Sequence, residues 1–339
     1  MDQELLMARC LQLARLGKGR TLTNPMVGAL LVHEGKIIGE GFHSAYGADH
    51  GEIEAFKSVT KEDQERIAYS TLYVNLEPCC YHGKTPPCAD EIIRRGIKKV
   101  VVGTPDPNPK VNGMGIERLK AHGVDVRFPV LEAECRALNR FFFTNMQKQR
   151  PFILLKFACS KDSYIGNYHR AVPISNAWSR YIVHKVRHEV DGILIGTRTA
   201  LNDNPRLTNR FYYGKSPVRI VMDRYGKIPA DFHLFSDGQP TWLFTESPAI
   251  RPTPVRVFAW EKELQKMMDV LMQEGIGSLL VEGGAYTLQS FIDLGLWDEI
   301  WVTQSGLVLG SGVKAPKFTG NLVNEFHLRQ DKLSIYKPL

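Results

Sequence analysis

The sequence predicts an α/β fold divided between two domains, and three observations support this. The chain has 339 residues, and a typical domain has about 100–200, so two domains are expected. In both halves, short apolar segments typical of buried strands alternate with segments of helical periodicity, an order that builds a sheet covered by helices. The pattern stops within residues 141–150 and starts again at Pro151, so we expect domains at 1–146 and 147–339.

The first half opens with an amphipathic helix. Its first residues include Asp2 and Glu4, and it lacks the continuous apolar segment of a signal peptide. Residues 27–32 and 36–39 flank a turn-forming His33-Glu34-Gly35, which predicts a β-hairpin. The elements expected next are a helix at 50–58, a strand at 71–76, a loop at 79–87, a helix at 88–95, a strand at 98–103, a helix at 115–121 and a strand at 124–128.

The second half repeats this rhythm from the strand that begins at Pro151. Further buried strands are expected at 192–196, 218–223, 241–245, 255–259, 278–281 and 299–308, with helices that include 261–273 and 285–294. Residues 324–339 are interpreted as a final strand or a tail.

The composition is that of an ordinary globular protein, with 43% hydrophobic and 23% charged residues. The formal charge of +7 suits an anionic partner, but the basic residues are scattered, so we expect a phosphorylated small molecule and no nucleic acid. No stretch approaches the roughly 18 apolar residues of a membrane span. Three of the six cysteines lie within residues 79–88, which indicates metal binding or catalysis, not a disulfide framework, and favours a cytoplasmic location.

Three residues have the side chains of a catalytic zinc site. His50, Cys79 and Cys88 offer one nitrogen and two sulfur ligands, leaving a fourth position for water. Glu52, two residues after His50, is placed to move protons without binding the metal, as in zinc nucleobase deaminases. This combination predicts hydrolytic deamination, in which water must be activated and the leaving nitrogen protonated.

Two other interpretations of these residues remain open. In a structural zinc site, Cys80 or His82 would be the fourth ligand, and in a site without metal His50 would be an ordinary histidine. Neither interpretation explains why Glu52 is present. Neither explains why Glu77-Pro78 leads into the cysteine loop. We therefore favour catalytic zinc and regard Cys80 as a bystander.

The order of motifs in the first half resembles the bifunctional deaminase/reductase family of riboflavin biosynthesis. The matching segments are Thr23-Asn24-Pro25-Met26-Val27-Gly28, Gly41-Phe42-His43, His50-Gly51-Glu52, Glu77-Pro78-Cys79-Cys80-Tyr81-His82-Gly83-Lys84-Thr85-Pro86-Pro87-Cys88 and Asp106-Pro107-Asn108-Pro109. The resemblance implies a cytidine-deaminase-like α/β/α domain that acts on 2,5-diamino-6-ribosylamino-4(3H)-pyrimidinone 5′-phosphate. It also implies a substrate site lined by Asn24, His43, His82, Lys84, Asp106 and Asn108. From the sequence alone, Asn24 and Asn108 fit equally well as turn formers beside prolines.

The second half resembles the reductase of the same family. The matching segments are Pro151-Phe152-Ile153-Leu154-Leu155-Lys156, residues 191–199, Asp203-Asn204-Pro205-Arg206-Leu207-Thr208 and Val281-Glu282-Gly283-Gly284. The resemblance implies a dihydrofolate-reductase-like α/β domain that uses NADPH. The implied cofactor residues are Cys159, Thr199, Asp203, Gly284, Ala285, Tyr286, Thr287 and Leu288, and the implied substrate residues are Lys156, Arg187, Leu207, Arg210 and Glu282.

Arg224 is our own candidate for the NADPH 2′-phosphate, because it follows the strand predicted at 218–223 and ligands approach such strand ends. Arg198 is the reserve, and a solvated turn before Gly226 explains Arg224 equally well.

Four positions depart from the family pattern. Gly51 stands where Ala is usual, and we expect no loss of activity. Cys159 stands where Ala is often found, and Ser163 stands where Gly is common. Pro173 stands where a cofactor-contacting Trp is often found, and Trp178 is a nearby substitute for that Trp.

The sequence thus predicts a two-step enzyme with Zn²⁺ and NADPH as cofactors, a phosphorylated pyrimidine as substrate and a homo-oligomeric state. Zinc-activated water removes the 2-amino group, and NADPH then reduces the ribosyl group. The alternative is a nucleoside or RNA-base zinc deaminase with a non-catalytic ligand-binding second domain.

Overall fold

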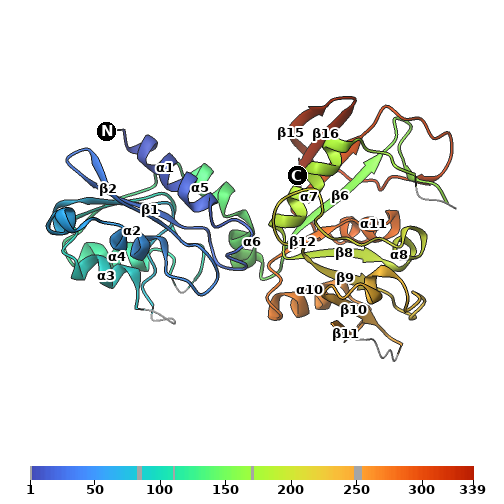
Figure 1. Cartoon of the computed structure of the whole chain (residues 1–339), viewed down its shortest axis with the longest axis horizontal. Coiled ribbons are helices and arrows are strands. Elements are labelled where there is room, and N and C mark those ends of the chain that lie inside the picture. The colour runs from blue at the N-terminus through green and yellow to red at the C-terminus, as the bar shows by residue number, and fades with distance from the viewer. Residues whose placement is uncertain (1, 82–85, 110, 169–171, 248–253) are drawn as a thin grey trace. The chain divides into compact units, whose positions relative to one another are not determined.

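The computed structural model describes residues 2–81, 86–109, 111–168, 172–247 and 254–339. The chain divides into two compact units, Met1–Arg150 and Pro151–Leu339 (Figure 1). The boundary expected after residue 146 falls within helix α6 (Arg140–Lys148), the last helix of the first unit.

The described part of the first unit contains a five-stranded mixed sheet of order β2-β1-β3-β4-β5. β1 pairs antiparallel with both β2 and β3, whereas β3, β4 and β5 are parallel. The expected hairpin forms as β1 and β2, and β2 extends three residues beyond its expected end. The strands are β1 (Gly28–His33), β2 (Lys36–Phe42), β3 (Thr71–Val74), β4 (Lys99–Val102) and β5 (Asp125–Arg127).

Helices cover both faces of this sheet, as the α/β/α prediction requires (Figure 1). Successive residues of β1 pack into separate apolar cores on the two faces of the sheet. Leu30 packs with α1 and α5, and Leu31 packs with α2, α3, α4 and α6. Such two-sided burial explains why the strands are apolar throughout. The helices are α1 (Gln3–Arg15), α2 (Gly51–Lys57), the 3₁₀ helix η1 (Lys61–Tyr69), α3 (Cys88–Arg94), α4 (Met114–Ala121), α5 (Glu132–Leu138) and α6.

The described part of the second unit contains a nine-stranded sheet of order β11-β10-β9-β8-β12-β6-β13-β16-β15, and a separate two-stranded pair, β7 and β14. Its strands from β11 to β13 are parallel, and β16 and β15 are antiparallel. The strands are β6 (Phe152–Cys159), β7 (Tyr164–Gly166), β8 (Gly192–Gly196), β9 (Val218–Met222), β10 (Thr241–Thr245), β11 (Val255–Ala259), β12 (Ser278–Val281), β13 (Glu299–Gln304), β14 (Val313–Lys314), β15 (Asn321–Leu328) and β16 (Asp331–Lys337).

The helices of the second unit connect these strands. The apolar faces of α10 and α11 share one core with β6, β8, β9, β10, β12 and β13. The C-terminal segment is neither a single strand nor a tail: β15 and β16 form a hairpin that extends the sheet. The helices are α7 (Ala177–Glu189), α8 (Thr197–Asp203), α9 (His233–Ser236), α10 (Leu264–Gln273) and α11 (Ala285–Asp293). In the described ranges, every helix is too short or too polar to cross a membrane.

Candidate active sites

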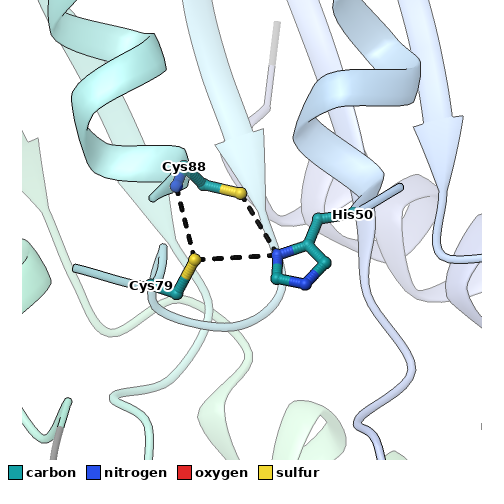
Figure 2. Close-up of side chains that lie close together, drawn as sticks. All are labelled: His50, Cys79 and Cys88. Atoms are coloured by element: carbon teal, nitrogen blue, oxygen red, sulfur yellow. Dashed lines mark hydrogen bonds between the residues drawn. The ribbon is translucent and has the colours of Figure 1, made fainter. Parts of the chain in front are cut away.

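Three separate segments bring His50, Cys79 and Cys88 together in the first unit (Figure 2). His50 precedes the first residue of α2 and makes no capping hydrogen bond with its side chain. Cys79 lies in the loop after β3, and Cys88 is the first residue of α3. Their donor atoms all lie within 4.8 Å of one another.

The geometry of this cluster fits zinc. His50 Nδ1 is 3.2 Å from Cys88 Sγ and 3.7 Å from Cys79 Sγ. Two zinc ligands in tetrahedral geometry are about 3.6–3.8 Å apart, given Zn–S and Zn–N bonds of about 2.3 and 2.0 Å. A hydrogen bond between the two thiols lowers the pKa of Cys79 and raises that of Cys88, so Cys79 is the first of the two to form the thiolate that binds metal.

Among the described residues, the cluster contains three candidate ligands. Cys80 is half-buried and does not join the cluster. His82 and Lys84 lie outside the described residues, so the predictions for these two positions stay predictions. Three described ligands correspond to the open coordination of catalytic zinc.

Glu52, in the first turn of α2, is buried beside these ligands. Its side chain is 3% exposed, and Oε2 has no hydrogen-bond partner among the residues that the structure describes. Burial raises the pKa of Glu52 to about 7; a smaller effect of His50 lowers it, and a smaller effect of Cys79 raises it further. A carboxyl group with this pKa accepts and donates protons readily near neutral pH.

Asn24 and His43 are brought next to the metal ligands. Asn24 Nδ2 is 3.3 Å from His43 Nε2, and His43 Nδ1 is 3.0 Å from the carbonyl oxygen of Asp49, one residue before His50. The rings of His43 and His50 meet edge to face at 5.6 Å. Burial lowers the pKa of His43, which favours a neutral ring in this site.

Asp106 and Asn108 share one loop between β4 and α4. The Asn108 N–H donates to Asp106 Oδ1 at 2.8 Å, and the Asp106 N–H donates to Glu77 Oε2 at 3.0 Å. Burial, together with the charges of Glu77 and Cys79, raises the pKa of Asp106 to about 6. The structure therefore places this loop close to the metal ligands.

The second unit contains a cavity of about 950 Å³, within the usual size of a ligand site. It opens where several parallel strands end, the usual position of ligand sites in such sheets. Most residues expected to bind cofactor or substrate line it: Lys156, Arg187, Thr199, Asp203, Leu207, Arg224, Glu282, Gly284, Ala285, Tyr286 and Thr287.

A buried ion cluster lies in this cavity. Glu282 Oε2 is 2.6 Å from Arg187 and Oε1 is 3.3 Å from Lys156. Burial alone would raise the pKa of Glu282, but these two cations lower it to about 2. Glu282 is therefore ionised and holds both cations at the cavity wall.

The helix α11 begins at the cavity, with Gly284 as its N-cap. A Cβ atom at Gly196 would lie 2.5 Å from Thr287 Oγ1, so glycine there allows the first turn of α11 to approach the end of β8. The free N–H groups of this turn form a favourable environment for a phosphate.

Three of the expected reductase residues do not line the cavity. Cys159 and Leu288 are buried in the apolar core. Arg210 donates its backbone N–H to His184 Nδ1 at 2.9 Å. Their proposed roles in binding therefore gain no support from the cavity.

Trp260 and Lys262 line the cavity, although sequence reasoning did not single them out. Both follow β11, and the strand-end rule that selected Arg224 after β9 would also have found them. Arg224 itself lines the cavity and is paired with Glu246 at 3.0 Å.

The departures from the family pattern have visible structural settings. Pro173 lines the cavity, whereas Trp178 does not and lies 5.7 Å from the Arg329 guanidinium. Ser163 has a φ of 66°, a left-handed conformation that explains why glycine is common there.

Two family models match the chain, one for each unit. The "cytidine and deoxycytidylate deaminase zinc-binding region" matches residues 1–104, and the "RibD C-terminal domain" matches residues 151–338. The first match contains the three metal ligands and Glu52, and the second contains the whole cavity.

Relatives of known name match almost the entire chain. The riboflavin biosynthesis protein RibD of Aquifex aeolicus is 38% identical over 316 residues, which cover 91% of this chain and 88% of the relative. The protein of the same name from Escherichia coli is 32% identical, covering 93% of this chain and 90% of the relative.

Solved structures are similar to this chain over almost its full length. The diaminohydroxyphosphoribosylaminopyrimidine deaminase/5-amino-6-(5-phosphoribosylamino)uracil reductase of Thermotoga maritima is 36% identical, with a TM-score of 0.91 and 99% coverage of both chains. RibD from Acinetobacter baumannii is 28% identical, with a TM-score of 0.87. These likenesses favour two catalytic units over a nucleoside or RNA-base deaminase with a non-catalytic second domain. The chain therefore belongs to the RibD family of riboflavin biosynthesis, whose members join a zinc-dependent deaminase domain to a reductase domain.

Proposed function

We propose that this chain catalyses two consecutive reactions on one intermediate of riboflavin biosynthesis. The first unit removes the 2-amino group of 2,5-diamino-6-ribosylamino-4(3H)-pyrimidinone 5′-phosphate by hydrolysis. The second unit reduces the ribosyl group of the product to a ribityl group with NADPH. The observation that carries the proposal is the combination of three metal ligands with a buried carboxyl group whose Oε2 lacks a partner among the described residues.

In the deaminase unit, His50, Cys79 and Cys88 hold zinc. When bound, zinc polarises a water molecule for attack on the ring carbon that carries the amino group. Glu52 takes a proton from this water and delivers a proton to the amino nitrogen, which leaves as ammonia. Its pKa of about 7 suits both transfers.

The substrate residues proposed for this unit, where the structure describes them, are assigned to two sides of the same ligands. Asn24 and His43 are assigned to the side of His50, and Asp106 and Asn108 to the side of Cys79. Amide and carboxyl groups offer both donors and acceptors to a pyrimidine ring or a ribose. His82 and Lys84 are assigned to the substrate phosphate.

In the reductase unit, bound NADPH would supply a hydride to C1′ of the opened ribose, while the nitrogen attached to C1′ takes up a proton. The cofactor is assigned to the start of α11, residues 284–288, and to Thr199 and Asp203, with its phosphates at the N–H groups of that helix start. The substrate is assigned to the cavity wall formed by Lys156, Arg187, Leu207 and Glu282, with Arg210 and Cys159 as further candidates for substrate and cofactor contacts.

The wider setting is also part of the proposal. Two of the six cysteines, Cys79 and Cys88, are proposed metal ligands that must stay reduced, which supports a cytoplasmic location. A small phosphorylated substrate, and no nucleic acid, accounts for the positive charge. Edge strand β15 exposes Leu322, Val323 and Phe326, which supports a homo-oligomeric state.

One experiment tests both activities. Purified protein is incubated with the pyrimidinone phosphate, first alone and then with NADPH, while ammonia and NADPH absorbance are followed. We expect ammonia in the first stage and NADPH oxidation only after it. Cytidine and adenosine serve as alternative substrates, and faster ammonia release from either would contradict the proposed substrate.

A further inference from the structure

Glu77 is a buried carboxylate with no role in the mechanism above. It lies between the end of β3 and Cys79, and its side chain is 3% exposed. Each of its oxygens accepts two backbone hydrogen bonds. Oε2 accepts from Asp106 at 3.0 Å and Gly113 at 2.9 Å, and Oε1 accepts from Gly115 at 2.9 Å and Ile116 at 3.1 Å.

These four donors lie at the two ends of one loop. Asp106 is at its start, and the other three are at or next to the beginning of α4, where N–H groups lack partners within the helix. The Glu77 N–H also donates to the Thr104 carbonyl oxygen at 3.0 Å. Glu77 therefore fixes both ends of the loop that carries Asp106 and Asn108.

The start of α4 packs directly against Glu77 and Pro78. A Cβ atom at Gly115 would lie 2.1 Å from the Pro78 carbonyl oxygen and 3.1 Å from Glu77 Oε1. Only glycine allows this approach without a shift of the backbone. Since Cys79 follows Pro78, one short segment connects the loop to a metal ligand.

We propose that Glu77 is a positioning residue of the deaminase, which sets the position of Asp106 and Asn108 relative to the metal ligands without touching the substrate. The inference rests on the proposed function, because it takes this loop as part of the pyrimidine site. It gives a role to the Glu77-Pro78 sequence that precedes the first metal-binding cysteine.

Glu77→Gln tests the proposal, because it keeps the shape of the side chain but turns an NH₂ group toward two N–H donors. We expect zinc content and reductase activity to stay at the wild-type level. Deaminase kcat/KM should fall about ten- to a hundredfold, mainly through KM, as expected when a binding group is displaced by about 1 Å. Glu91→Gln, which removes a carboxylate on the helix of Cys88 that pairs with Arg94 and Arg95, should leave both activities unchanged.

A mutant cycle separates positioning from general support of the fold. If Glu77 acts through Asp106 and Asn108, adding Glu77→Gln to a variant that already carries Asp106→Ala and Asn108→Ala should make that variant no slower. Independent effects that multiply would overturn the proposal. So would wild-type deaminase kinetics in Glu77→Gln.

Zinc content provides the remaining check. If Glu77→Gln loses zinc, Glu77→Asp, which keeps the charge but is one methylene shorter, is measured in the same cycle. Loss of zinc from both variants would overturn the proposal, because Glu77 would then support the metal site and not the loop. A wild-type protein that releases no ammonia would overturn the proposed function and this inference together, whereas an active wild type with an unaffected Glu77→Gln overturns the inference alone.

Discussion

Glu52 is the buried carboxyl group that we propose as the proton carrier of the deaminase. It is buried, its Oε2 has no partner among the described residues, and burial raises its pKa to about 7. A buried polar atom without a partner is costly, so such an atom beside metal ligands indicates a place for water or substrate. The proposed metal ligands and the proposed proton carrier are thus separate side chains.

Glu52→Gln should keep zinc but lower deamination about 10²- to 10⁴-fold, because an amide cannot carry the proton. Metal analysis and an ammonia assay measure the two properties. Glu54→Gln, on the same helix but hydrogen-bonded to Lys57, is the matched control and should behave as wild type. Normal ammonia release from metal-loaded Glu52→Gln would remove Glu52 from the mechanism.

Arg224 lines the reductase cavity beyond the end of β9, and Glu246 holds its side chain there. NADPH and NADH differ only in the 2′-phosphate. Arg224→Ala should therefore weaken NADPH binding about ten- to a hundredfold, the usual effect of losing a charged hydrogen bond, and leave NADH binding almost unchanged.

Titration of both cofactors into wild type and variant measures this preference. Lys227→Ala removes a cation from the same turn that does not line the cavity, and it should leave both affinities unchanged. Equal losses for NADPH and NADH in Arg224→Ala would transfer the assignment to Arg198, which also lines the cavity. A wild type that prefers NADH would contradict the cofactor assignment.

Among the elements, the turn between β6 and β7 is well bonded but has a strained backbone. Asp162 accepts hydrogen bonds from Ser160 Oγ at 2.6 Å and from the Leu309 and Gly310 N–H groups at 3.1 and 2.7 Å. Ser163, the next residue, has a φ of 66°. A side chain in this left-handed region is unfavourable, and glycine is free of that penalty.

Ser163→Gly should therefore raise the free energy of unfolding by about 0.5–1 kcal/mol. This is the energy gained by relieving the strain, reduced by the greater entropy of glycine in the unfolded chain. Urea denaturation measures the change. Ser163→Ala keeps the Cβ atom and should give no such gain. A Gly variant less stable than the wild type would contradict the strain argument.

Sequence patterns predicted best the features that depend on residues close together in the sequence or on the chemistry of single side chains. The turn at His33-Glu34-Gly35 identified the β1–β2 hairpin, and His50, Cys79 and Cys88 were predicted as ligands by their side-chain chemistry. Non-local features were missed. The contact between Glu77 and the start of α4 depends on strand order, and the exposed residues of β15 have no period that identifies a strand. The cavity residues Trp260 and Lys262 required the position of β11 in the sheet.

At the scale of the whole molecule, each unit buries its own apolar core. The core that contains Leu31 and Phe56 belongs to the first unit, and the core that contains Leu155 and Phe291 belongs to the second. Residues 147–339 should therefore fold alone and oxidise NADPH in the presence of the deaminated substrate. Circular dichroism and NADPH absorbance test this, with residues 1–146 as the complementary fragment. A folded fragment that fails to bind NADPH would show that the second unit is not an independent reductase.

The spacing of the metal ligands along the chain has a consequence for stability. His50 is 29 residues from Cys79 and 38 from Cys88. A bound metal ion therefore acts as a cross-link that closes long loops of the first unit, and the unfolded chain cannot reproduce it. Because the described ligands all belong to this unit, a chelator should lower the melting temperature of the deaminase unit and leave that of the reductase unit unchanged. Calorimetry of the full chain with and without chelator would then show one melting transition that shifts and one that does not. Under zinc shortage, the protein would still be able to reduce its substrate but would no longer be able to deaminate it.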